Sequence, residues 1–222
     1  MDELTYAIGD VHGCADALES LLDRIAAHGA GLRRRLVFLG DYIDKGPESA
    51  RAVAIVRRLQ AADPEAVVCL MGNREAFLLQ AARDPRRAGA WITTGGDRTL
   101  ASYRAARVAD LPADELAWIA GLRTVHEDAL RYYVHAGFRP GRRGIDPSVK
   151  ARLWIREPFL SADFDFGKHV VHGHTPCYAG VPERHLYRTN LDTAAVRTGR
   201  LTAAVFDRTD PGPVAFLQSR AA

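Results

Sequence analysis

The chain has 222 residues, 47% of them hydrophobic, and this size suits one large α/β domain over residues 1–222. Its 30 basic and 27 acidic residues give a net charge of +3, too even a balance to predict a nucleic-acid or membrane partner. The three cysteines are widely spaced, which excludes a disulfide framework and a zinc finger. We find no signal-peptide pattern and no apolar run near the ~18 residues that span a bilayer, so we expect a cytoplasmic protein.

The first third of the chain alternates short apolar runs with amphipathic stretches. We expect strands at 4–8, 36–39 and 66–71, and helices at 15–27, at 49–59 and from 76 onward. Each strand ends in a glycine followed by an aspartate or an asparagine. This βαβαβα order predicts a parallel sheet with helices packed on it.

The remainder of the chain changes in character. Residues 83–123 are rich in arginine and alanine with a helical period, which predicts a helical insertion able to flank a cleft. Strands are expected again at 132–135 and 169–171. The runs 186–191, 201–206 and 214–217 are separated by glycine and proline turns, and we expect them to form a second, partly antiparallel sheet.

Side chains that bind metals follow the predicted strands, at the edge of the sheet where α/β proteins bind ligands. They are Asp10, His12, Asp41, Asp44, Asn73, His135 and His174. Carboxylate, imidazole and amide donors together suit manganese, iron or zinc. Two such cations roughly 3.5–4 Å apart can activate a water and stabilise a phosphoryl transition state. A turn explains any one of these motifs alone, but it does not explain all of them in this order on strand ends.

The motifs GDVHG, GDYIDKG, GNRE, VHAG and HGHT, in this order, resemble those of the calcineurin-like metallophosphoesterases. Within that superfamily they are most similar to the phosphoprotein phosphatase branch, in particular to small bacterial and phage enzymes. Pro176 favours this branch, because many non-protein phosphoesterases have a second histidine there. The resemblance implies a four-layer α/β/β/α sandwich of two mixed sheets, with the helical insertion around residues 83–123 added to it.

The resemblance also implies two divalent metal ions, expected to be manganese, with iron or zinc as alternatives. The ligands carried over by position are Asp10 and His12 for the first ion, Asp41 for both ions, and Asn73, His135 and His174 for the second. Arg156 matches a family arginine that binds the substrate phosphate. An ion pair between Arg156 and Glu157 on the surface explains the local sequence equally well.

Two positions depart from the family pattern. Lys45 replaces an arginine that binds substrate phosphate, and a lysine supplies charge without the bidentate fork. Arg74 replaces the histidine that pairs with the aspartate at position 44 and protonates the leaving group. Because arginine stays protonated at neutral pH, Arg74 is a poor acid, although it can pair with Asp44 and stabilise negative charge. Leaving groups that need little protonation are expected to suffer least.

These features predict a metal-dependent phosphomonoesterase, foremost a serine/threonine protein phosphatase. Its expected substrate is a phosphoprotein or phosphopeptide, or a small phosphoester. One alternative is a symmetrical dinucleoside polyphosphate hydrolase, because those enzymes share most of the motifs and an LDT-like ending similar to residues 191–193. The other alternative is a weakly active pseudo-phosphatase, which Lys45 and Arg74 motivate and the intact set of metal ligands disfavours.

Overall fold

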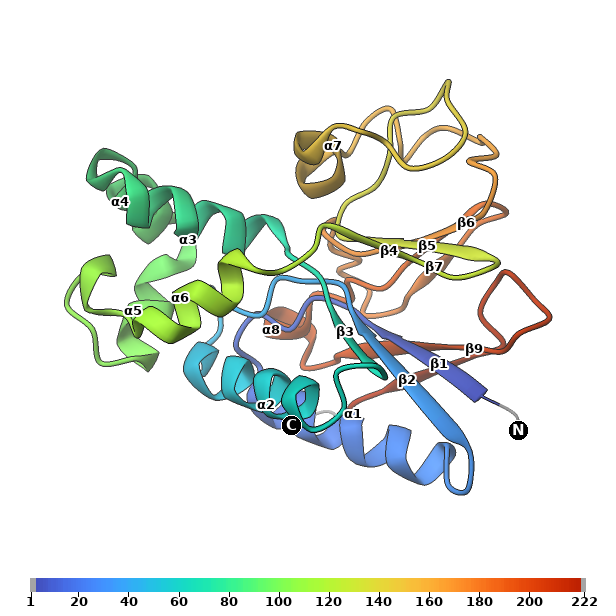
Figure 1. Ribbon diagram of the computed structural model, residues 1–222, viewed down its shortest axis with the longest axis horizontal. Coiled ribbons are helices and arrows are strands. Elements are labelled where there is room, and N and C mark those ends of the chain that lie inside the picture. The colour runs from blue at the N-terminus through green and yellow to red at the C-terminus, as the bar shows by residue number, and fades with distance from the viewer. Residues whose placement is uncertain (1–2, 221–222) are drawn as a thin grey trace.

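Two mixed β-sheets, stacked face to face, form the centre of the computed structural model, which describes residues 3–220 (Figure 1). The first sheet contains, in spatial order, β10 (Ala215–Gln218), β9 (Thr202–Phe206), β1 (Glu3–Ile8), β2 (Arg33–Phe38) and β3 (Val67–Cys69). Strands β1, β2 and β3 are parallel, whereas β9 runs antiparallel to both β1 and β10. The carboxyl ends of the three parallel strands therefore lie at one edge of the sheet.

The second sheet contains, in spatial order, β4 (Val125–Glu127), β5 (Arg131–Val134), β6 (His169–His172), β8 (Arg188–Asn190) and β7 (Glu183–Arg184). Its three central strands β5, β6 and β8 are parallel, and the two edge strands are antiparallel to their neighbours. Each sheet thus contains three adjacent parallel strands, which lie at one side of the first sheet and in the middle of the second.

Helices cover the outer face of the first sheet and one end of the sandwich (Figure 1). Helices α1 (Ala15–His28) and α2 (Ser49–Ala62) pack on the sheet itself. The end of the sandwich carries α3 (Asn73–Arg83), α4 (Pro85–Trp91), the π-helical turn η1 (Ile92–Gly96), α5 (Asp97–Ser102), the 3₁₀ turn η2 (Val108–Asp110) and α6 (Ala113–Ala120). Two short helices follow, α7 (Val149–Trp154) beside the second sheet and α8 (Ala195–Thr198). Within residues 3–220, no helix is both long and apolar enough to cross a bilayer.

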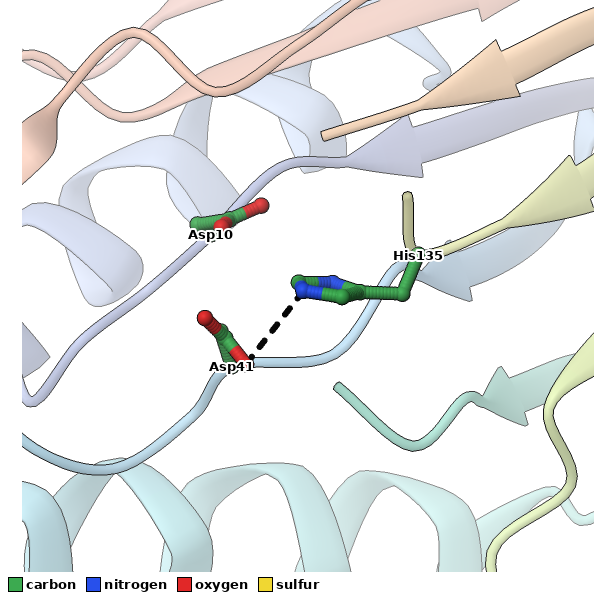
Figure 2. Close-up of side chains that lie close together, drawn as sticks. All are labelled: Asp10, Asp41 and His135. Carbon is green, nitrogen blue, oxygen red and sulfur yellow. Dashed lines mark ion pairs between the residues drawn. The ribbon is translucent and has the colours of Figure 1, made fainter. Parts of the chain in front are cut away.

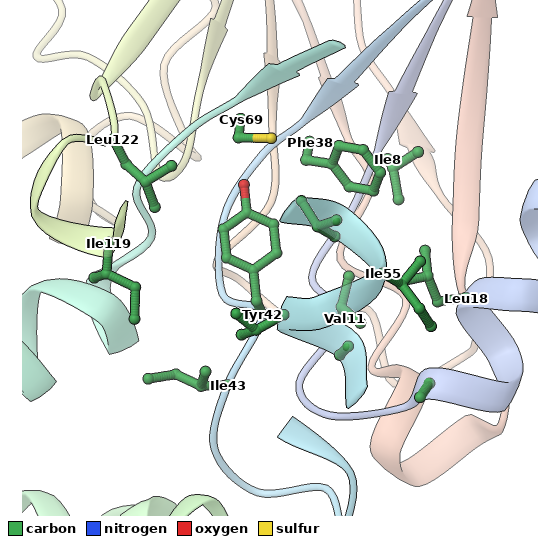
Figure 3. Close-up of a cluster of buried hydrophobic side chains, with 14 of the residues drawn as sticks. Ile8, Val11, Leu18, Phe38, Tyr42, Ile43, Ile55, Cys69, Ile119 and Leu122 are labelled. Carbon is green, nitrogen blue, oxygen red and sulfur yellow. The ribbon is translucent and has the colours of Figure 1, made fainter. Parts of the chain in front are cut away.

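Alternation of side chains along β1 divides the core into layers. Tyr6 and Ile8 point toward α1 and α2, whereas Ala7 faces the second sheet. Figure 3 shows the larger cluster, in which Ile8, Leu18 and Ile55 join a strand and the two helices. The hydroxyl of Tyr42 donates to the Leu70 carbonyl at 2.8 Å, so the loop after β2 is anchored within this core. The core therefore fixes the loops that follow the parallel strands.

The structure confirms the four-layer arrangement of two mixed sheets and the helical character of residues 83–123. One expectation about strand pairing was wrong. Only the first of the three late strands, β8, enters the second sheet, whereas β9 and β10 extend the first sheet beside β1. The apolar pattern of β9 has buried residues on both faces and so fits either sheet, and the long-range pairing of β9 with β1 decides between them.

Candidate metal centre

Three titratable side chains from three different strand ends meet at one point between the sheets. Asp10 follows β1, Asp41 follows β2 and His135 follows β5, and each offers a ligand atom within 4.8 Å of the others (Figure 2). The Nε2 atom of His135 lies 3.5 Å from Oδ1 of Asp41. All three side chains are buried. This meeting of carboxylate and imidazole groups gives the centre of the site.

The other three predicted ligands surround this centre. Nε2 of His12 lies 3.4 Å from Oδ2 of Asp41 and 3.9 Å from Oδ2 of Asp10. Oδ1 of Asn73 lies 2.8 Å from Nε2 of His135 and 2.9 Å from Nδ1 of His174. Asp41 thus has one oxygen facing His12 and the other facing His135. The structure brings all six predicted metal ligands together and places Asp41 between the two halves of the set.

Several residues around the site have backbone conformations that residues other than glycine rarely adopt. Positive φ angles occur at five of the predicted site residues, namely His12, Asp41, Asp44, Lys45 and His174. Two glycines permit close approach, because a Cβ on Gly72 would lie 2.2 Å from Oδ1 of Asp41 and one on Gly173 would lie 2.1 Å from Oδ1 of Asp10. Strained backbone of this kind persists where the surrounding fold holds it, and it concentrates at functional sites.

Hydrogen bonds turn the histidine lone pairs toward the centre. The Nδ1 atom of His12 contacts the carbonyl of Ile43 at 3.0 Å, and that of His135 contacts the carbonyl of Leu39 at 3.1 Å. A proton on each Nδ1 leaves the Nε2 lone pair free, the usual arrangement for a metal-bound histidine. Burial lowers the pKa of His135 to about 3 and that of His174 to about 2, so both rings are neutral at physiological pH.

The carboxylates show that this donor set fits divalent cations. Burial raises the pKa of Asp41 to about 7, although the backbone N–H of Arg74 and the charge of Lys45 lower it. Burial, followed by the nearby carboxylate of Asp192, raises the pKa of Asp10 well above its usual value. Buried carboxylates beside neutral imidazoles stay ionised at little cost only when a cation joins them. The mixture of oxygen and nitrogen donors, without sulfur, suits manganese, iron or zinc.

Arg74 and Asp44 form a buried ion pair beside the centre. Nε of Arg74 donates to Oδ2 of Asp44 at 2.6 Å, and Nη2 donates to the backbone carbonyl of Thr94 at 2.9 Å. Asp44 also accepts hydrogen bonds from Trp91 Nε1 at 2.9 Å and from Thr99 Oγ1 at 2.6 Å. Burial raises the pKa of Asp44, while the Arg74 guanidinium and these hydrogen bonds lower it. The guanidinium is held in one orientation and remains charged.

The two predicted phosphate-binding residues occupy different positions. Nζ of Lys45 lies 2.9 Å from Nε2 of His12, the atom expected to face a metal. Arg156 is exposed. Burial, the His135 ring and the positive charge of Arg156 together lower the pKa of His174. Among residues 3–220, Arg156 has no ion-pair partner, and Oε2 of Glu157 accepts a hydrogen bond from Ser161 Oγ instead. Arg156 is therefore available to an anion at the edge of the site.

Several supporting residues escaped the sequence analysis. Glu75 accepts hydrogen bonds from the backbone N–H groups of Asp41, Tyr42 and Gly72, which joins the loops after β2 and β3. Its place in the GNRE motif was visible, but its role depends on loops that are distant in sequence. Trp91, in the helical insertion, belongs to none of the motifs, yet its indole N–H donates to Asp44 at 2.9 Å. No local pattern distinguishes such a tryptophan from an ordinary core residue.

Residues 5–199 of this chain match the sequence model of the calcineurin-like phosphoesterase family. A symmetrical bis(5'-nucleosyl)-tetraphosphatase from Pseudomonas fluorescens (strain SBW25) is 33% identical over 138 residues, which are 61% of this chain and 44% of that protein. The enzyme of that name from Dechloromonas aromatica (strain RCB) is 35% identical over 138 residues, with the same coverage of each chain. The chain thus spans less than half the length of these curated relatives.

A solved structure described as a candidate diadenosine tetraphosphatase superimposes with a TM-score of 0.72. It is 23% identical and covers 97% of this chain and 92% of its own, so this likeness concerns the fold alone. The names of the sequence relatives contradict the expectation of a serine/threonine protein phosphatase acting on phosphoproteins, which was wrong. That expectation came from the resemblance of the motifs, with Pro176 as added support, and neither identified the substrate.

Proposed function

Because the chain belongs to the calcineurin-like phosphoesterase family, we propose that this metallophosphoesterase hydrolyses dinucleoside polyphosphates. Water would cleave the central P–O–P linkage of a dinucleoside tetraphosphate and release two nucleoside diphosphates. The names of the sequence relatives support this substrate class. The observation that carries the proposal is the state of Arg74, which cannot protonate a leaving group.

The leaving group decides what a site without a general acid can cleave. Arg74 is bound to both Asp44 and Thr94, and a guanidinium does not release its proton near neutral pH. An alkyl phosphate would leave as a strongly basic alkoxide, which needs that proton. A nucleoside diphosphate leaves through a phosphate oxygen whose pKa is about 6, so it departs as an anion. The fixed charge of Arg74 can stabilise this anion at no cost in reorganisation.

The metal roles in this proposal follow the arrangement around Asp41. Asp10 and His12 would hold one divalent ion, Asp41 would serve both, and Asn73, His135 and His174 would hold the other. Bound cations would acidify a water and neutralise phosphoryl charge. We propose manganese because carboxylate and amide oxygens make up half of the six donors and none of the donors is sulfur.

Two cations of the protein itself would bind the polyphosphate. Arg156 is exposed, has no ion-pair partner among residues 3–220, and would offer its guanidinium for bidentate contact with phosphate. Lys45 would have to leave Nε2 of His12, 2.9 Å away, before that nitrogen could bind a metal. The released ammonium could then turn toward the substrate. Metal loading and phosphate binding by Lys45 would in this way be coupled.

A substrate comparison tests the proposal. The purified protein, supplied with Mn²⁺, is assayed on diadenosine tetraphosphate, on p-nitrophenyl phosphate and on ethyl phosphate. We expect kcat/KM to be highest for the dinucleotide, intermediate for the aryl ester and lowest for the alkyl ester, following the basicity of the leaving group. An alkyl ester cleaved as well as the dinucleotide would contradict the proposal, and so would a dinucleotide left intact while the aryl ester is cleaved.

A further inference from the structure

A large aromatic side chain stands partly in water beside the metal centre. Trp154, the last residue of α7, is 38% exposed. Its ring centroid lies 6.3 Å from that of His174, a predicted metal ligand, and 6.5 Å from that of Phe77 in α3. Trp154 and Phe77, called here the aromatic platform, are neighbouring rings from α7 and α3. Figure 1 labels both helices.

Neither aromatic neighbour stacks in parallel on the indole, and Trp154 is partly exposed. The planes of Trp154 and His174 are inclined by 80°, and those of Trp154 and Phe77 by 68°. Both contacts are edge-to-face, so neither neighbour stacks in parallel on the indole. Tryptophan contributes more apolar surface than any other side chain, and exposing it to water forfeits favourable burial. An indole in this position is suited to a flat partner.

Helix α7 holds the tryptophan firmly in place. The Ser148 side chain accepts the hydrogen bond of the Ala151 N–H at the start of the helix. The carbonyl of Arg152 accepts from the N–H of Ala136 at 2.8 Å, next to the metal-site residue His135. The side chain of Arg152 in turn donates to Oγ1 of Thr124 at 3.0 Å. A platform anchored in this way loses little conformational entropy when a ligand stacks on it.

Two arginines accompany the aromatic platform. The Arg74 guanidinium carbon lies 5.6 Å from the centroid of Phe77. Arg156 follows Trp154 by two residues and is exposed. A flat aromatic surface near cations and a metal centre matches a ligand that combines a π-system with a chain of phosphates. Nucleotides have this composition, whereas an inorganic phosphate or an alkyl phosphate lacks the ring.

We infer that the aromatic platform binds a nucleobase of the substrate, which stacks on Trp154 while the adjoining phosphates reach the metal centre. The inference rests on the proposed function, and it specifies which part of the substrate lies where. Tyr178 is the competing exposed aromatic residue, at 63% exposure. The guanidinium carbon of Arg197 already lies 5.0 Å from the centroid of its ring, so one of its faces is covered.

Binding of adenosine diphosphate, the proposed product, tests the inference without requiring turnover. The metal-loaded protein is titrated with adenosine diphosphate and with inorganic pyrophosphate, which has no base, while tryptophan fluorescence and heat of binding are recorded. The variants are Trp154→Ala and Trp154→Phe. The matched control is Trp118→Phe, which alters a half-buried tryptophan that donates to Gln60 at 2.7 Å. Tyr178→Ala tests the competing residue.

Stacking of a base on an aromatic side chain sets the expected effect. Trp154→Ala should raise the Kd for adenosine diphosphate about 5- to 150-fold and leave that for pyrophosphate unchanged. Trp154→Phe should lose less affinity for adenosine diphosphate than Trp154→Ala, but adenosine diphosphate should no longer quench its tryptophan fluorescence. Trp118→Phe should keep both the affinity and the quenching. An unchanged Kd in Trp154→Ala, an equal loss for both ligands, or a loss in Tyr178→Ala instead would overturn the inference. Failure of the proposed function would be seen in a different experiment, in which the unaltered protein leaves diadenosine tetraphosphate intact.

Discussion

Replacing Arg74 with histidine tests whether this position lacks a general acid. In Arg74→His, the imidazole would face Oδ2 of Asp44, the atom that now accepts from Arg74 Nε at 2.6 Å. Trp91 and Thr99 would still fix Asp44 through hydrogen bonds of 2.9 Å and 2.6 Å. A neighbouring carboxylate stabilises the protonated imidazole, so the new histidine should be able to release a proton to the leaving group.

The expected change of kcat/KM in Arg74→His differs between ethyl phosphate and diadenosine tetraphosphate. General acid catalysis contributes about 10²–10⁴-fold, so kcat/KM for ethyl phosphate should rise by that order in Arg74→His. The rate with diadenosine tetraphosphate should change by less than about tenfold, because its leaving group departs as an anion. The variant loses the two hydrogen bonds of Nη2 with Thr94, at 2.9 and 3.1 Å. Their loss should cost about 1–3 kcal/mol of stability.

The assay measures kcat/KM for both substrates in the parent protein, in Arg74→His and in Arg74→Gln. Glutamine can pair with Asp44 but cannot act as an acid, so Arg74→Gln is the matched control and should not gain activity on ethyl phosphate. Denaturant unfolding of each variant separates a loss of folded protein from an effect on chemistry. Two results would show that position 74 does not lack a general acid. One is an unchanged ratio of the two kcat/KM values in Arg74→His. The other is an equal gain of activity on ethyl phosphate in Arg74→Gln.

Three further predictions concern metal, phosphate and pH. Asp41→Asn should reduce the bound metal of the dialysed protein, measured by elemental analysis, because Asp41 faces both His12 and His135, and full retention would contradict this role. Arg156→Ala should lower kcat/KM by about 1.5–3 kcal/mol, equivalent to about 10–150-fold, and parental kinetics would make it a surface residue. Burial lowers the pKa of His169 to about 4, so from about pH 7 to about pH 5 only the unfolded state gains its proton, and in unfolding measurements this residue alone should contribute about 2 kcal/mol to the loss of stability over that range. His169→Gln should lose that part of the pH dependence, and an unchanged slope would contradict it.

Local patterns predicted the parts of the fold and site that depend on short stretches of chain. Strand ends with glycine and an acidic or amide residue identified Asp10, Asp41 and Asn73, because parallel strands bring such ends to one edge. The placement of β9 and β10 could not be predicted, because an apolar strand buried on both faces fits either sheet. Long-range pairing, which no local pattern encodes, determined their position.

The meeting of the candidate metal ligands at one place was predictable from the sequence, and the substrate was less so. The metal motifs are similar in enzymes that cleave different phosphoesters, so they specify the reaction type without the leaving group. Arg74 carried that information, and its departure from the family pattern was visible in the sequence. The hydrogen bonds that hold it, with Thr94 and Asp44, required the structure, because the helical insertion that provides Thr94 has no motif of its own.

The proposed reaction is cleavage of the middle anhydride of a dinucleoside tetraphosphate. Product analysis of diadenosine tetraphosphate turned over by the Mn²⁺-loaded protein in ¹⁸O-labelled water tests it. We expect adenosine diphosphate as the sole nucleotide product, with ¹⁸O in one of the two molecules formed per cleavage. Release of adenosine monophosphate with adenosine triphosphate, or an intact dinucleotide under conditions in which p-nitrophenyl phosphate is hydrolysed, would contradict it.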